Sequence, residues 1–565
     1  MKIVFKNFYE IIPIFTFVIV CSFFYRNTIH LEHADFDILH RIINPDSPKG
    51  KVTYDPHFNY LYLYSYLLEI FKIDLNLLVK IIWFVEKIVT LMIIYLISSL
   101  IIKKKNYLII AILYYFLMRG GQVDQKSFSL IFQLLSVYFF FNSKFIFSAF
   151  FLSIVFYFHV GMGLWWYMPS VFSFIYLIYK NEINYTIKDF LIYNSLIIFL
   201  ILPIIYFYFF YINISSSLDI TSLSEFWYGV NNSLYLFIIR NKYTDIFFVL
   251  SNFIFFIFSI NILKDYLKTN FVKLVSIIFG ISIIFLINEI IVNLTLNSTL
   301  LKLQILRSHE ILFYFSLIFL SKILFDQIKR NNPIFFILFI LVLIPNPLYF
   351  LLKYISFWNQ VYIVWYLTLL YELLNNKFKF EEIYFIKRFF YIFELINFKK
   401  LYYFFVIFVF IFAITNQFID LKKYLISVFN DKKYIHQKEY NLDDLIKFVN
   451  NIDNKEAIFM IPFNEPDFSL FINKKTLVTT IDVFDILPSK SKFMINFFKD
   501  EFSFGYKELL NKDKTQKLWN NLNEDDFINW NNKYGITHII RESKYPLNFY
   551  KIFNDKKYHI YIIKK

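Results

Sequence analysis

Long apolar runs constrain this chain more than any other feature of its sequence. A helix needs about 20 mostly apolar residues to cross the hydrocarbon core of a bilayer, and runs near that length recur along the sequence. Of the 565 residues, 58% are hydrophobic, against roughly 45–50% in soluble globular chains. We therefore predict an α-helical polytopic membrane protein with about 13 transmembrane helices, at residues 9–25, 78–102, 107–118, 128–142, 145–158, 164–179, 189–212, 246–263, 274–294, 311–325, 333–351, 358–375 and 401–416.

Positive charge is concentrated in alternate loops between these runs. With the N-terminus, which carries Lys2 and Lys6, in the cytoplasm, every inward loop is basic, as at 103–105, 264–273 and 377–400. Lysine and arginine resist translocation, so basic loops stay inside. The net charge of +15 has its explanation here, and we therefore exclude nucleic acid as a partner.

The spans divide the chain into two domains. An odd number of spans leaves residues 417–565 outside, after a transmembrane domain over 1–416. We expect a multi-pass protein of the cell inner (plasma) membrane, with a cytoplasmic N-terminus and an extracytoplasmic C-terminal α/β domain. The patterns in that domain predict helices at 443–451 and 524–534, the second ended by Gly535, and strands at 457–462, 476–482, 536–541 and 558–563.

The long first outward loop, residues 26–77, contains the densest group of polar residues. Its segment HLEHADFDILHR places Asp35 and Asp37 in an Asp-x-Asp pair, with His33 and His40 close by. Two such carboxylates can share a divalent cation, Mg²⁺ or Mn²⁺, or raise one another's pKa so that one acts as a base. We predict Asp35 and Asp37 as catalytic residues and as the metal ligands, and the two histidines as substrate-binding residues. The alternative is a solvated loop.

Two short outward loops carry further candidate binding residues. MRGGQVDQKS contains Arg119, Asp124 and Lys126, and its paired glycines would let the backbone approach a ligand closely. The alternative there is a tight turn that needs positive φ. FHVGMGLWW places His159 at the outer end of a span, where a histidine either lines a ligand cavity or has a structural role.

The segment LKLQILRSHE contains two more candidates for substrate binding, Arg307 and His309. The fixed fork of donors on a guanidinium matches a phosphate, whereas the alternative is a snorkelling anchor. Inside the spans, Glu86 and Lys87 form a conspicuous pair of charges. Adjacent residues point in different directions on a helix, so we do not assume that these two side chains pair.

Several classes of chemistry are excluded by the sequence. Cys21 is the only cysteine, so a disulfide within the chain and a cysteine-based metal site are both impossible. No Walker loop, GxSxG elbow, HExxH motif or dinucleotide fingerprint occurs in the required setting. We therefore expect no cofactor apart from the divalent cation.

The arrangement of these features resembles the GT-C superfamily of polytopic membrane glycosyltransferases. The shared features are an N-terminal signal anchor, a long outward loop with an early Asp, many further spans and a C-terminal extracytoplasmic α/β domain. The order of IPFNEPDFSLFINKKTLVT, WNNKYGITHIIRES and YHIYIIKK is also similar to that in the terminal domain of uncharacterised bacterial members. The resemblance implies that Asp35 or Asp37 is the catalytic carboxylate and that Arg307 contacts the phosphate of a lipid carrier.

The resemblance further implies an enzyme that moves a sugar from a polyprenyl-phosphate-linked donor to a glycan, lipid or protein acceptor at the outer face. A lipid or glycan transporter or flippase, and a non-catalytic membrane scaffold, are the alternatives. Transporters often have inverted repeats and helices broken at mid-membrane. The sequence has no convincing repeat, and Pro203 is the one obvious mid-span proline, so transfer is favoured over transport.

Overall fold

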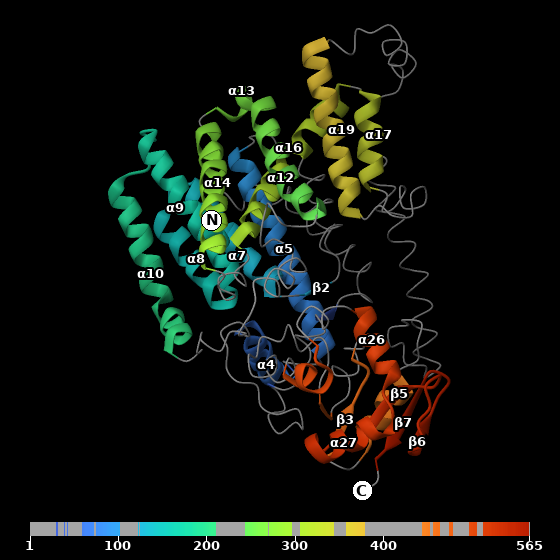
Figure 1. Ribbon diagram of the computed structural model, residues 1–565. Helices are drawn as coiled ribbons and strands as arrows, with labels where there is room; N and C mark the ends of the chain where they lie inside the picture. Colours follow the sequence, from blue (N-terminus) through green and yellow to red (C-terminus); the bar gives the residue numbers. More distant parts are fainter. Residues whose placement is uncertain are drawn as a thin grey trace.

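The computed structural model consists of a bundle of helices and a small α/β unit. The bundle fills the upper part of the view, and the α/β unit lies at its lower right (Figure 1). The structure describes residues 30–31, 39, 42, 59–72, 75–101, 122–123, 125–210, 243–268, 270–295, 305–330, 332–343, 357–378, 443–452, 456–463, 474–477, 496–504 and 512–563.

The helices of the bundle are mostly apolar and follow one another with short turns in several places. They are α4 (Asn59–Phe71), α5 (Leu75–Ile101), α7 (Gln125–Phe141), α8 (Phe145–Phe158), α9 (Val160–Tyr179), α10 (Ile187–Phe210), α12 (Tyr243–Ile262), α13 (Lys264–Leu267), α14 (Asn270–Thr295), the 3₁₀ helix η3 (Ile305–His309), α16 (Glu310–Lys329), α17 (Pro333–Leu343) and α19 (Phe357–Phe378).

Where the predicted spans fall on described residues, each overlaps one of these helices, and the helix at 145–158 has the predicted bounds. Four described helices are long and apolar enough to cross a membrane, namely Val160–Tyr179, Ile187–Tyr206, Asn270–Asn288 and Arg307–Lys329. Shorter apolar helices lie at Phe128–Phe141, Phe145–Phe158, Val249–Ile262 and Ile363–Asn375. The spans predicted at 9–25, 107–118 and 401–416 lie outside the described residues, so the total of 13 stays a prediction.

Small residues allow α9 and α14 to pack closely. A Cβ placed on Gly280 of α14 would lie 2.3 Å from the carbonyl oxygen of Pro169 in α9, so glycine is required there. Ser173 of α9 also donates a hydrogen bond to the carbonyl of Ser276 at 2.9 Å. Pro169 lies inside α9 as Pro203 lies inside α10, so the expectation of a single obvious mid-span proline is wrong.

Basic turns lie together at one end of the bundle. Lys144 connects α7 to α8, Lys180 connects α9 to α10, and Arg330 follows α16. Lys273 donates to the carbonyl of Phe141, beside the first of these turns, at 2.8 Å. Figure 1 shows α13 and the turn between α16 and α17 at the end of the bundle away from the α/β unit. We call this the basic end.

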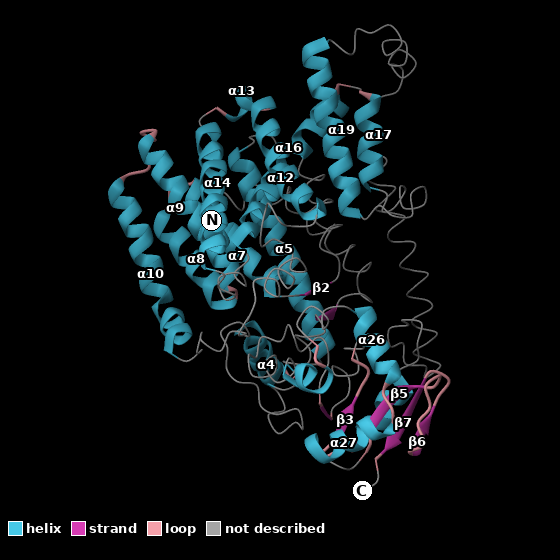
Figure 2. Cartoon of the chain, in the orientation of Figure 1, coloured by secondary structure: helices cyan, strands magenta, loops and turns pink. Residues whose placement is uncertain are grey.

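The α/β unit contains a five-stranded sheet packed against helices (Figure 2). The strand order is β4-β3-β5-β7-β6, with β3 parallel to β4 and β5, and β7 antiparallel to β5 and β6. The elements are α22 (Asp443–Asn450), β3 (Ile458–Met460), β4 (Lys475–Thr476), α26 (Lys512–Asn521), α27 (Glu524–Tyr534), β5 (His538–Glu542), β6 (Tyr550–Asn554) and β7 (Tyr558–Ile562).

Each face of the sheet buries its own set of side chains. On one face, Trp519 of α26 and Phe527 of α27 pack against Met460 and Tyr561 of the sheet. On the other face, Leu445 of α22 belongs to a second cluster with residues of β3, β5 and β7. The alternation of side chains along a strand therefore divides the sheet between two small cores.

The sequence predicted much of this unit. The helix over 524–534 ends at Gly535, whose φ of 72° is left-handed, and the predicted strands at 457–462, 536–541 and 558–563 contain β3, β5 and β7. Of the strand predicted at 476–482, the described residues include only its first two, of which Thr476 belongs to β4. Neither α26 nor β6 was predicted.

One carboxylate connects α27 to the helical segment 496–502. Glu501 accepts hydrogen bonds from Trp530 Nε1 at 2.9 Å, Lys533 Nζ at 2.5 Å and the Tyr534 hydroxyl at 2.6 Å. Partial burial by itself would raise the pKa of Glu501, but these donors stabilise the ionised form and the pKa is lowered overall.

Candidate functional site

Two of the predicted outward loops are connected by a pair of short strands. The strand β1 (His30–Leu31) belongs to the first of these loops, and β2 (Gln122–Val123) belongs to the second. The strands are parallel, with His30 opposite Gln122 and Leu31 opposite Val123. Leu39, a few residues after β1, is fully buried in the main core of the bundle. The first loop therefore contacts the second through β1 and the core of the bundle through Leu39.

His159 and His309 both lie at the end of the bundle opposite the basic end. His159 lies between α8 and α9, and His309 is the last residue of η3, immediately before α16. We call this the histidine end. The strand β2 also lies there, because it precedes α7, whose far end turns into α8 through residues 142–144.

Arg307 and His159 meet on one tryptophan at the histidine end. The guanidinium carbon of Arg307 lies 4.9 Å from the ring centroid of Trp165, and the His159 ring centroid lies 5.4 Å from the same ring. Arg307 Nε also donates to Glu310 Oε1 at 2.6 Å, one helical turn further on. The ring and the carboxylate together fix the orientation of the guanidinium, which suits recognition of a phosphate.

His159 has a structural role, one of the two possibilities for this residue. Its Nδ1 accepts a hydrogen bond from the Met162 amide at 3.2 Å, so it caps the N-terminus of α9. Because Nδ1 accepts, the proton of the neutral imidazole is on Nε2. The cap holds the ring at the start of α9, close to Trp165.

His309 is buried beside α12 and α14. Its Nδ1 lies 2.9 Å from Asn252 Nδ2, so the asparagine amide donates when the proton of the neutral ring is on Nε2. The Phe285 ring packs edge-on, with its centroid 6.5 Å from that of His309. The side chain is 2% exposed, so His309 is packed inside the bundle and does not lie on an open surface.

Of the remaining predicted site residues, the structure describes only Lys126. Lys126 lies half-buried in the first turn of α7, at the same end as His159. The side chains of Asp35, Asp37, His33, His40, Arg119 and Asp124 lie outside the described residues. Within the described part of the chain, no three His, Cys, Asp or Glu side chains form a group that could hold a metal ion.

Glu86 and Lys87 form an ion pair, which their adjacent positions in the sequence did not let us assume. Lys87 Nζ lies 3.1 Å from Glu86 Oε1, and the two side chains are 0% and 2% exposed. The ammonium also lies 5.9 Å from the ring centroid of Trp83. Burial removes the water that would solvate either charge, so the flexible lysine side chain bends back to the nearest carboxylate.

Sequence reasoning missed two residues that organise this site, Trp165 and Asn252. Trp165 follows Gly161 and Gly163 in the segment FHVGMGLWW. Because 23% of the residues are aromatic, one more aromatic residue is weak evidence for a functional site. Asn252 is a buried amide within an otherwise apolar run. A polar group there costs free energy unless it is hydrogen-bonded, which is the signal that could have revealed it.

Comparisons with known proteins assign no family to these residues. No protein-family model matches the chain, and no curated protein matches its sequence.

Proposed function

We propose that the chain is a multi-pass membrane protein whose basic end faces the cytoplasm. The four long apolar helices support a position in the bilayer. The collection of Lys144, Lys180 and Arg330 at one end supports the orientation, because basic loops remain on the cytoplasmic side. The histidine end, with β1 and β2, would then face outward.

We propose that the protein is a glycosyltransferase of the GT-C type, acting at the outer face on a polyprenyl-phosphate-linked sugar. The observation that carries the proposal is the pairing of β1 with β2. It brings together the loop that contains Asp35 and Asp37 and the loop that contains Arg119 and Asp124. A second group, Arg307 on Trp165, lies at the same end of the helices.

In this proposal each polar group has a role in one substitution. A hydroxyl oxygen of the acceptor, which is a glycan, a lipid or a protein, attacks the anomeric carbon of the sugar. The bond from that carbon to the carrier phosphate breaks, and the phosphate leaves with the bonding electrons. Asp35 or Asp37 takes the hydroxyl proton or holds a divalent cation, while Arg307 contacts the phosphate.

The test measures transfer of a labelled sugar from membrane lipid to an acceptor fraction, with the full chain in lipid vesicles. General-base catalysis is typically worth about 10²–10⁴-fold, so we expect Asp35→Asn or Asp37→Asn to reduce transfer by about that factor. Asp55→Asn, in the same loop, is the matched control and should transfer at the wild-type rate. Chelation of divalent cations tests the metal separately.

Two outcomes would contradict the proposal. Unchanged transfer in both Asp variants and in the double variant would remove the catalytic assignment. Movement of the labelled lipid across the vesicle membrane without covalent transfer would instead support the transporter alternative.

A further inference from the structure

Arg541 is a buried cation in the α/β unit, far along the chain from the candidate transfer site. It lies on β5 and is 2% exposed. Its Nη2 donates to the carbonyl of Asn520, at the end of α26, at 3.0 Å. Among the described residues, its Nε and Nη1 have no hydrogen-bond partner. Arginine is almost never fully buried unless it is paired, so this side chain requires an explanation.

The carboxylates near Arg541 are bonded elsewhere. Glu542 pairs with Lys544 at 2.7 Å, and Glu524 accepts from the backbone N–H of Asn548 at 2.9 Å. Asp526 accepts from the backbone N–H of Asn523 at 2.9 Å in the capping box of α27. The negative charges of these carboxylates therefore act on Arg541 only through longer-range electrostatic attraction. Burial is the larger effect, so the pKa of the guanidinium lies below its ordinary value.

Aromatic rings surround the guanidinium and supply another unpaired donor. The carbon of the guanidinium lies 5.9 Å from the Trp519 ring centroid, 5.6 Å from that of Phe527 and 6.0 Å from that of Tyr545. The indole Nε1 of Trp519 is buried and has no hydrogen-bond partner among the described residues. His559 lies opposite Arg541 on β7, and cross-strand partners project from the same face of a sheet.

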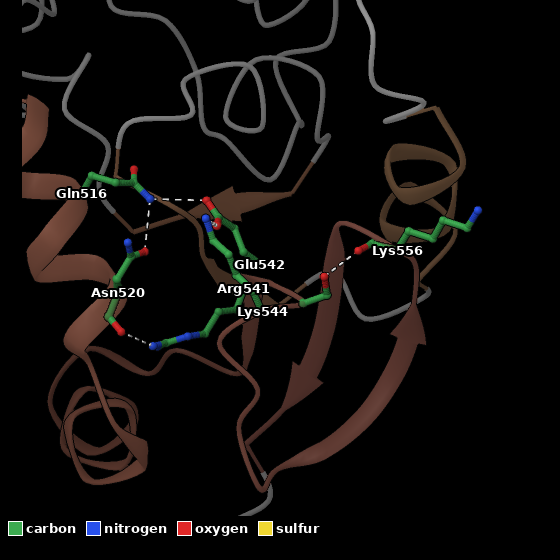
Figure 3. Close-up of polar contacts among 7 residues, drawn as sticks. Gln516, Asn520, Arg541, Glu542, Lys544 and Lys556 are labelled. Carbon is green, nitrogen blue, oxygen red and sulfur yellow. Dashed lines mark hydrogen bonds and ion pairs between the residues drawn. The ribbon is translucent and has the colours of Figure 1, made fainter.

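Polar side chains of α26 border this position. Figure 3 shows Gln516 and Asn520 of α26 facing Arg541 and Glu542 of β5. Gln516 Nε2 donates to Asn520 Oδ1 at 3.2 Å and to Glu542 Oε1 at 3.3 Å. These side chains are partly exposed, so they give the buried guanidinium a polar boundary toward solvent.

We propose that Arg541 is the centre of an oxyanion-binding site, which takes a phosphoryl or carboxylate group against its unpaired guanidinium donors. A planar guanidinium matches the oxygens of either group. A bound oxyanion would satisfy buried donors whose desolvation is otherwise uncompensated. The site lies on β5, where the parallel part of the sheet meets its antiparallel part, and it does not depend on the proposed glycosyl transfer.

The test is hydrogen exchange of peptides over 512–522 and 536–542 in the full chain, held in lipid nanodiscs. Inorganic phosphate, acetate and chloride are titrated at matched ionic strength. A ligand that binds only the closed site lowers the equilibrium constant for opening by a factor of one plus its concentration over Kd. Exchange that requires opening of the site should therefore slow about tenfold at ten times Kd. Saturable slowing in phosphate but not in acetate identifies a phosphoryl site, and slowing in both identifies a site that also accepts carboxylates.

Variants connect the effect to Arg541. Arg541→Met and Arg541→Lys should abolish the saturable slowing, since neither retains the planar fork of donors. Lys544→Gln is the matched control, because it removes an exposed cation beside Glu542 and leaves Arg541 in place; the slowing should persist. The wild-type titration stands even if the Arg541 variants do not fold. No saturable slowing over chloride in the wild type, or undiminished slowing in Arg541→Met, would overturn the proposal.

Discussion

His538 should make the α/β unit sensitive to acid. The ring is 5% exposed and stacks on Phe459 with centroids 4.6 Å apart. Burial, reinforced by the positive charge of Lys474, lowers the pKa of His538 from its ordinary 6.5 to about 4. The unfolded chain therefore binds more protons than the folded one between these values, so stability falls as the pH drops from about 6.5 to about 4.

The loss of stability expected on protonation of His538 follows from the shift of its pKa. A tenfold change in proton affinity corresponds to about 1.4 kcal/mol, so full protonation of His538 should remove about 3 kcal/mol of local stability. Hydrogen exchange over 536–542, corrected for the intrinsic effect of pH on the chemistry, measures this in the full chain. His538→Gln should flatten the acid dependence, while Lys475→Gln, on an exposed neighbour of Lys474, should leave it unchanged. An equally steep profile in His538→Gln would exclude this histidine as its source.

The helices could be predicted from the sequence because their signals are long and redundant. A run of apolar residues near the thickness of a bilayer survives errors of several positions, and Gly535 marks the end of α27 by a backbone angle that other residues rarely adopt. The helix α26 escaped prediction because its sequence, KDKTQKLWNN, is largely polar, although Trp519 is fully buried. The strand β6 escaped because its residues are all at least partly exposed.

The pairing of β1 with β2 is an element that no sequence pattern predicts, since each strand has two residues. Directly paired residues of neighbouring strands have side chains on the same face. In a Cys21→Ser background, His30→Cys with Gln122→Cys should therefore form a disulfide under mild oxidation. Leu31→Cys with Gln122→Cys is the control, because these side chains would point to opposite faces. A higher yield in the control pair, measured by gel shift, would show that the register is different.

The sequence indicated candidate site residues but could not predict which of them lie close together in the folded molecule. Arg307 and His159 are separated by nearly 150 residues and come together only because both contact Trp165. The support of His309 by Asn252 likewise depends on the packing of η3 against α12. Contacts of this kind depend on how the helices pack in three dimensions. Patterns in a single sequence do not show that packing.

The proposed function requires that the basic end of the bundle faces the cytoplasm, and this orientation can be tested. If the basic end is cytoplasmic, Lys180 and the exposed residue Tyr550 of β6 lie on opposite sides of the membrane. In a Cys21→Ser background, a membrane-impermeant maleimide added to right-side-out vesicles should label Tyr550→Cys at once. It should label Lys180→Cys only after permeabilisation, because that turn stays with the other basic loops.

Both side chains are well exposed: Tyr550 is 60% exposed, and Lys180 is also exposed. A lack of labelling therefore shows that the membrane blocks the reagent, and not that the residue is buried. Labelling of Lys180→Cys in sealed vesicles with protection of Tyr550→Cys would reverse the orientation, and the Asp35 loop would then lie on the cytoplasmic side, away from any acceptor at the outer face.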